Sequence, residues 1–251
     1  NMLYNTEALI LNTRFYGDTS LICNLFTKKY GRLSIISKGA RTLKNPNRAI
    51  LQPAQFIDLH YYYKPGRNIQ ILKEASINKH FFLIHKNYNK IILSYNIIDI
   101  MNQICKTENP NEIIFRLVKT VLNKIDCCHN DTMQLYYVFF QVQLLKYLGY
   151  QPIIENCATC EVEIKQANYN FSIGQLTCNR CTKHHNHYKP LVLTENLLTL
   201  IKKISNIHIN LLGASVAYDI SDLESIKQYL LYYLSFHVVN IKNLKSMALM
   251  K

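Results

Sequence analysis

The sequence lacks a long apolar run: no stretch approaches the roughly 18 residues that a helix needs to cross a bilayer. The N-terminus has no charged segment followed by an apolar one, so we expect neither a transmembrane helix nor a secretory signal. Internal repeats and low-complexity tracts are also missing. With 49% hydrophobic and 18% charged residues over 251 positions, the composition is globular and long enough for two domains.

Motifs of the large enzyme classes are missing as well. The sequence contains no GxxxxGK[ST] loop, no GxGxxG after a strand, no HExxH and no GxSxG. The acids Asp58, Glu74, Asp99, Glu155 and Glu161 are scattered, without the paired arrangement that indicates a nuclease metal site. We therefore predict a protein that is not an enzyme. A metal-dependent nuclease or nucleic-acid modifier is the enzymatic alternative, and it would show turnover on DNA or RNA with added metal.

Acidic residues are scarce relative to basic ones. The chain has 29 lysines and arginines against 16 acids, a formal net charge of +13. Residues 1–80 hold 12 of the basic residues and four of the acids, and Lys28–Arg48 contains seven basic residues and no acid. This charge favours a polyanionic partner, either nucleic acid or an acidic membrane surface. A soluble basic protein without such a partner is the alternative.

The first 80 residues have the pattern of a small β-barrel. Ile57, Leu59 and Tyr61 alternate with Asp58 and His60, as in a strand with one buried face. Five stretches rich in Ile, Leu, Phe, Tyr and Thr, separated by turn signals, predict strands at 7–13, 19–27, 32–38, 54–63 and 69–77. Five short antiparallel strands suit an OB-fold, and an SH3-like barrel fits nearly as well.

After residue 80 the apolar residues recur with helical spacing. We expect helices near 80–105 and 195–205 and three more with apolar stripes. One stripe runs from Ile114 to Leu122 after Pro110, and another from Leu135 to Leu148, stopped by Gly149. Ser221–Glu224 has the spacing of a capping box and should open a helix. The prediction is an α+β protein with an OB-fold domain at 1–80 and an α-helical domain at 81–251.

Four of the eight cysteines form the most specific pattern. Cys157 and Cys160, and then Cys178 and Cys181, make two CxxC knuckles separated by 17 residues, as in zinc sites. Phe171, Ile173 and Leu176 around Gly174 suit a hairpin between the knuckles. Four thiolates close the coordination shell of a tetrahedral metal, so we predict one structural Zn²⁺ in an inserted module at about 151–190. A redox dithiol pair and four unligated thiols are the competing interpretations.

The remaining cysteines lack ligand spacing. Cys23, Cys105, Cys127 and Cys128 are expected at core or neutral positions. His184, His185 and His187 follow the second knuckle and could replace a cysteine as ligand, although four thiols make solvent or an anion the better expectation. Without an export signal the thiols should be reduced or bound to metal, which indicates the cytoplasm.

The basic residues of the barrel are the candidates for nucleic-acid binding, because lysine and arginine neutralise phosphates. They are Arg14, Lys28, Lys29, Arg32, Lys38, Arg41, Lys44 and Arg48. Aromatic residues among them could stack on bases: Phe15, Tyr16, Phe26, Tyr30 and the run Tyr61–Tyr63. Tyrosines in the core and a merely solvated basic face are the alternative.

Taken in order, these features resemble the RecO family of bacterial recombination mediators. The segments that carry the resemblance are Glu7–Arg14, Tyr16–Ser20, Phe26-Thr27, Tyr30–Leu33, Ser37–Arg41, Gln52-Pro53, both knuckles with Phe171 and Gly174, His237, and Leu244–Ser246. The central helices match in type more than in motif, and the absence of tryptophan departs from the family pattern.

The resemblance implies an N-terminal OB-fold, a helical domain and a zinc module whose ligands map onto the four knuckle cysteines. It places Lys38 and Arg41 at the DNA face. It also implies a cytoplasmic, nucleoid-associated bacterial protein that binds single- and double-stranded DNA and anneals complementary strands. With RecR, such a protein loads RecA onto DNA coated by single-strand-binding protein, whose acidic tail it binds. The alternative is a zinc-ribbon adaptor or transcription factor, which would prefer one duplex sequence.

Overall fold

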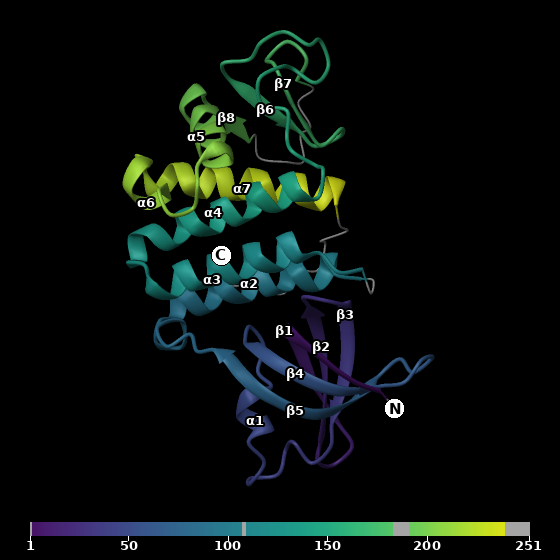
Figure 1. The fold of residues 1–251 in the computed structure, drawn as a ribbon. Coiled ribbons are helices and arrows are strands. Elements are labelled where there is room, and N and C mark those ends of the chain that lie inside the picture. The colour runs from purple at the N-terminus through teal and green to yellow at the C-terminus, as the bar shows by residue number, and fades with distance from the viewer. Residues whose placement is uncertain (1, 107–108, 183–190, 239–251) are drawn as a thin grey trace. The chain divides into compact units, whose positions relative to one another are not determined.

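The computed structural model describes residues 2–106, 109–182 and 191–238. They fall into two compact units that divide between Cys127 and Cys128 (Figure 1). His184, His185, His187 and the segment Leu244–Ser246 lie outside the described residues. The boundary between domains at residue 80 stays a prediction.

The first unit opens with a closed five-stranded barrel. Its strands are β1 (Met2–Tyr16), β2 (Ser20–Thr27), β3 (Gly31–Ser37), β4 (Phe56–Tyr63) and β5 (Gln70–Lys79), in the order β1-β2-β3-β5-β4. The ring closes where β4 pairs with β1, and β3 pairs with β5 in parallel. A short helix, α1 (Asn47–Ile50), lies between β3 and β4. The arrangement confirms the predicted OB-like barrel in an α+β protein.

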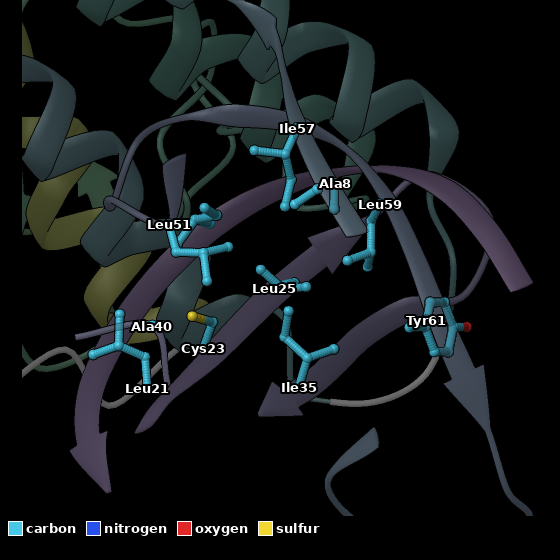
Figure 2. Packing of buried hydrophobic residues seen from close by; sticks show 12 residues of the cluster. Ala8, Leu21, Cys23, Leu25, Ile35, Ala40, Leu51, Ile57, Leu59 and Tyr61 are labelled. Atoms are coloured by element: carbon cyan, nitrogen blue, oxygen red, sulfur yellow. The ribbon is translucent and has the colours of Figure 1, made fainter. Parts of the chain in front are cut away.

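The barrel core consists of the inward-facing residues of the strands. Leu25, Ile35 and Leu59 point toward one another at its centre and are fully buried (Figure 2). The predicted alternation in β4 is confirmed, since Ile57 and Leu59 are buried while Asp58 is exposed. β1 begins at Met2, earlier than predicted, because its first residues pair with β4 from Met2 opposite Tyr63. Pairing between distant segments extends a strand beyond its own sequence pattern.

Two helices complete the first unit: α2 (Tyr88–Ile104) and α3 (Glu112–Cys127), after a 3₁₀ turn η1 (Ile84–Lys86). The stripe predicted for α3 is confirmed, because Ile114, Leu117, Val118, Val121 and Leu122 are all buried. Asn111 opens α3, and its side-chain oxygen accepts the Ile114 N–H at 3.0 Å. The turn before α2 is fixed by Asp126, whose Oδ1 accepts the N–H groups of Leu83 and Ile84 at 2.8 Å each.

The second unit contains α4 (Asn130–Tyr147), α5 (Glu195–Asn206), α6 (Leu212–Ser215) and α7 (Ile220–His237). A small sheet of order β7-β6-β8 joins them, with β6 (Ala167–Asn170), β7 (Gln175–Thr177) and β8 (Val192–Leu193). Gly149 ends α4 as predicted: at φ +80° it donates to Lys146 O, and Tyr150 donates to Leu145 O. α4 is buried on all sides from Leu135 to Leu145, beyond the stripe predicted from its spacing.

The predicted capping box of α7 is wrong. The helix begins two residues earlier than the box requires, with Asp219 instead of Ser221 at the N-cap and no side-chain cap hydrogen bond, so Ser221 lies inside the first turn. Glu224 does not reach back toward the helix start, because its carboxylate accepts from Lys227 Nζ at 2.6 Å. The ion pair with the mostly buried Lys227 takes the acid that the box would use.

Candidate metal centre and nucleic-acid interface

The four knuckle cysteines come together at one point. The Sγ atoms of Cys157, Cys160, Cys178 and Cys181 all lie within 4.8 Å of one another. The Sγ atoms of Cys160 and Cys178 are 3.7 Å apart. A disulfide would need about 2 Å, and a tetrahedral zinc with Zn–S distances of about 2.3 Å places its sulfurs about 3.8 Å apart. The spacing therefore fits four ligands of one metal ion.

Backbone turns aim the thiols at that point. In the first knuckle, the N–H of Glu161 donates to Cys157 O at 2.9 Å, and Glu161 itself adopts a left-handed φ of +59°. In the second, the N–H groups of Cys181 and Thr182 both donate to Cys178 O at 3.0 Å. The predicted hairpin between the knuckles is confirmed as β6 and β7, and Gly174 at φ +65° makes its turn.

The electrostatics of the cluster also suit a cation. Burial opposes ionisation of the Cys157 thiol, but hydrogen bonds from backbone N–H groups, that of Cys178 foremost, outweigh it and lower its pKa to about 6. The backbone N–H of Cys181 likewise lowers the pKa of Cys178. Hydrogen bonding to the Cys160 and Cys178 sulfurs raises the pKa of Cys181 to about 12. A bound cation would balance the negative charge of the thiolates and would take the place of the proton on Cys181.

The donor set fits one structural metal ion. Four sulfur ligands fill a tetrahedral shell and leave no position for water or substrate, so the ion would brace the fold and carry no reaction. The other thiols are unlike these four. Cys23 and Cys105 have their pKa raised to about 12 by burial, and Cys127 is exposed.

An aromatic cluster that sequence analysis missed fixes the cysteine module to α7. The centroid of the Tyr169 ring on β6 lies 5.7 Å from that of Tyr229 and 6.2 Å from that of Tyr232. The ring centroids of Phe171 and Tyr232 are 5.2 Å apart. Beyond them, His237 Nε2 lies 2.7 Å from the Gly174 carbonyl oxygen. The α7 aromatics recur at helical spacing, so in the sequence they look like any core stripe.

The basic candidates divide between the two ends of the barrel. We call the first the loop end, formed by the β1–β2 turn at Gly17–Thr19 and the segment Lys38–Arg48. Hydrogen bonds hold it together. Arg41 donates from its backbone N–H to Thr19 O at 2.9 Å and from NH1 to Gly17 O at 3.2 Å, and Asn47 Nδ2 donates to Ser37 Oγ at 3.2 Å. Five of the eight basic candidates lie on this end or on the strand that leads to it: Arg14, Lys38, Arg41, Lys44 and Arg48.

The other three candidates lie at the packed end, which we define as the β2–β3 turn with Lys28, Lys29 and Arg32. Lys28 pairs with Glu112 at the start of α3 at 3.4 Å, and Lys29 Nζ donates to Asn5 Oδ1 at 3.1 Å. Arg32 donates to Cys105 O at 2.6 Å and to Asn102 O at 3.2 Å, the carbonyls that end α2. Its guanidinium therefore caps α2, and a role for Arg32 in nucleic-acid binding stays a prediction.

The aromatic candidates divide as well. Phe26 and Tyr61 are 2% and 1% exposed, so their predicted role in base stacking is wrong. Tyr61 and Tyr30 belong to a tyrosine cluster around Tyr4 that packs against the barrel core. By contrast, Phe15 and Tyr16 are 72% and 57% exposed. Phe15 lies beneath the Arg41 guanidinium, 3.9 Å from the ring centroid, a pairing that no sequence spacing could indicate.

Comparison with known proteins identifies both parts of the chain. The family model described as "Recombination protein O N terminal" matches residues 2–81, and that described as "Recombination protein O C terminal" matches residues 85–248. Among the described residues, no helix combines the length and apolar character of a membrane span.

Relatives named "DNA repair protein RecO" match over much of their length. That of Thermodesulfovibrio yellowstonii is 30% identical over 216 residues, which cover 84% of each chain. That of Chlorobium phaeobacteroides is 30% identical over 175 residues, 70% of this chain and 67% of its own. The Salinibacter ruber protein is 30% identical over 153 residues, 61% of this chain and 58% of its own. The chain therefore belongs to the RecO family of DNA repair proteins, which are recombination mediators and not enzymes.

Proposed function

We propose that this protein acts in the RecF pathway by binding single- and double-stranded DNA and annealing complementary single strands. With RecR, it helps to load RecA onto DNA coated by single-strand-binding protein, whose acidic C-terminal tail binds the helical domain. Membership of the RecO family supports this proposal. The observation in the structure that carries it is the set of basic residues at the loop end.

The basic side chains of the loop end have no acidic partner among the described residues. Within the described part of the chain, none of its five basic side chains forms an ion pair, whereas Lys28 at the packed end does. Arg14, Lys38 and Lys44 are exposed, and Asp18 is the acid in the same turn region. Such a surface neutralises phosphates without reading bases, which suits a protein that must bind DNA of any sequence.

The four-cysteine module has a supporting role in this proposal. One structural Zn²⁺ would be held by Cys157, Cys160, Cys178 and Cys181. The metal would stabilise the module, and with it the contact between Tyr169 of β6 and Tyr229 of α7. DNA contact comes from the barrel. The place of action is the cytoplasm, in association with the nucleoid.

A strand-annealing assay tests the proposal. Zinc-loaded protein should speed the pairing of two complementary oligonucleotides at low salt without ATP, and its affinity for single strands should fall as salt rises. Lys38→Glu/Arg41→Glu should weaken single-strand binding about 10- to 100-fold and slow annealing in proportion. A matched control, Lys79→Glu/Lys86→Glu, makes the same change of net charge at exposed lysines of the same unit. It should keep most of the activity.

Three results would overturn the proposal. The first is wild-type protein that neither binds nor anneals DNA at low salt. The second is equal loss of binding in both double variants, which would show an effect of net charge alone. The third is strong preference for one duplex sequence, which is the behaviour of a zinc-ribbon adaptor.

A further inference from the structure

The face of the barrel that OB-folds commonly offer to ligands, over the second and third strands, is covered in this protein. Phe26, which points outward from β2, packs its ring against Phe115 of α3 at 5.6 Å. Asn24 of β2 is hydrogen-bonded to Asn12 of β1 at 2.9 Å, and Asn12 donates to Asn102 of α2 at 3.0 Å. Helices therefore occupy the surface on which bases would otherwise stack.

The network on that face is satisfied without a ligand. Ser34 of β3 donates to Asn24 Oδ1 at 2.6 Å, and Arg32 NH2 donates to Asn102 Oδ1 at 3.2 Å. A base entering here would have to displace α2 and leave these half-buried polar groups without their hydrogen-bond partners, which is unfavourable. The route to bases must lie elsewhere on the barrel.

The loop end provides an exposed ring in a fixed position. Phe15 pairs with Leu21 across the β1–β2 hairpin, and Leu21 points into the barrel core, so Phe15 continues the inward-facing row past the end of the barrel. Arg41 covers one face of the ring at 3.9 Å, yet 72% of Phe15 is exposed. The other face of the ring is therefore open to solvent.

The arginine behind the ring is itself held in place. Its backbone N–H donates to Thr19 O at 2.9 Å, and its NH1 donates to Gly17 O at 3.2 Å. Little freedom is then lost when a flat ligand settles on the ring, because the platform is ordered beforehand. Lys38 and Lys44 belong to the same loop, and Leu43 beside Lys44 is 92% exposed.

We propose that Phe15, backed by Arg41, is a stacking subsite for an unpaired base of single-stranded DNA. This inference rests on the proposed function and adds to it a reason to prefer single strands. Phosphates on either side of the base meet the loop lysines, while the base covers the open face of Phe15. A duplex keeps its bases stacked on one another, so it can use the lysines but not the ring.

Two single-stranded ligands separate stacking from charge: a 20-residue oligothymidylate and a 20-residue abasic strand with the same phosphates. Wild type should prefer oligothymidylate. Phe15→Ala should bind it at least about fivefold more weakly and bind the abasic strand unchanged. The dependence of log affinity on log salt should keep its slope, since no phosphate contact is removed. Phe15→Trp should restore the preference, and Phe15→Leu should not.

Phe82→Ala is the matched control, because Phe82 is 67% exposed on the same unit but lies outside the loop end. It should behave as wild type. If Phe15→Ala binds both strands like wild type while Lys38→Glu/Arg41→Glu fails to bind, the stacking subsite is disproved and the proposed function stands. If wild-type protein binds neither strand at low salt, both the stacking subsite and the proposed function are disproved. Circular dichroism and the melting temperature of each variant confirm that it is folded.

Discussion

The packed end and the loop end of the barrel draw their basic residues from one acid-free stretch of sequence, Lys28–Arg48. β2 alone separates the two turns by about 23 Å, the length of eight residues in a strand. At the packed end the basic side chains contact other groups of the protein: Lys28 forms an ion pair with Glu112, and Arg32 caps α2. At the loop end they meet solvent, apart from Arg41 on Phe15.

The comparison shows that a basic run in a sequence does not define a binding surface. The β2–β3 turn lies beside the C-terminal end of α2 and the start of α3, where Arg32 and Lys28 bind their partners. The β1–β2 turn and the β3–α1 segment lie at the opposite end of the barrel. A cation near a helix C-terminus is stabilising because the last carbonyls carry partial negative charge. Arg32 therefore stabilises the fold, and residues such as Lys44 are left for a polyanion.

The largest effect we expect comes from Cys157→Ser, which tests whether the loop end acts independently of the cysteine module. Removing one of four metal ligands should reduce bound zinc and destabilise the module by about 4 kcal/mol or more. The salt dependence of single-strand binding should nevertheless stay that of wild type. Metal content by atomic absorption, thermal melting and binding titrations measure the three quantities. Normal zinc content with a normal melting temperature would show that the cysteines hold no metal.

Sequence patterns anticipated the parts of this protein that are determined locally. The two CxxC knuckles predicted a cluster because a two-residue spacer turns both thiols to one side, and the Sγ atoms do converge within 4.8 Å. Gly149 predicted the end of α4 because a glycine adopts the left-handed conformation readily. The alternation in β4 predicted its buried face because side chains in a strand point to opposite sides in turn.

The structural features that the sequence did not predict depend on contacts between residues far apart in the chain. Arg32 lies 73 positions from Cys105, whose carbonyl oxygen accepts its hydrogen bond. Its structural role therefore cannot be inferred from the residues near it in the sequence. Phe15 and Arg41 meet only because the β1–β2 turn and the β3–α1 segment share one end of the barrel. The position of Phe26 among the basic residues of the barrel predicts base stacking, but its ring packs against Phe115 of α3. Burial by a distant element decides between core and surface for such residues.

Among the basic residues of the two barrel ends, Arg32 should give the largest loss of stability when it is changed to alanine. The variant leaves the last carbonyls of α2 and the Asn102 side chain without their charged donor, so unfolding in urea should be easier by about 2 kcal/mol. Arg32→Lys should recover part of the loss, since a lysine cannot reproduce the two-pronged contact. Single-strand affinity of the folded variant should match wild type. A weakened affinity with unchanged stability would assign Arg32 to DNA after all.

Lys44→Ala tests the loop end one charge at a time. The exposed lysine has no ion-pair partner in the described part of the chain, so its loss should change the free energy of unfolding by less than about 0.5 kcal/mol. If Lys44 contacts a phosphate, the slope of log affinity against log salt should become shallower by about 0.7 for single strands. Fluorescence anisotropy at four or more salt concentrations measures it. An unchanged slope would exclude Lys44 from the interface.

Lys28→Ala should have the smallest effect on DNA binding and is the counterpart of Lys44→Ala at the packed end. The Lys28–Glu112 pair is 3.4 Å long between half-exposed side chains, and such pairs contribute about 0–1 kcal/mol because water screens them. The salt slope should stay that of wild type, since Glu112 already neutralises the lysine. Removing the acid instead, with Glu112→Gln, would free Lys28 and should leave DNA affinity unchanged or slightly stronger. A slope reduced by Lys28→Ala as much as by Lys44→Ala would extend the DNA surface to both ends of the barrel.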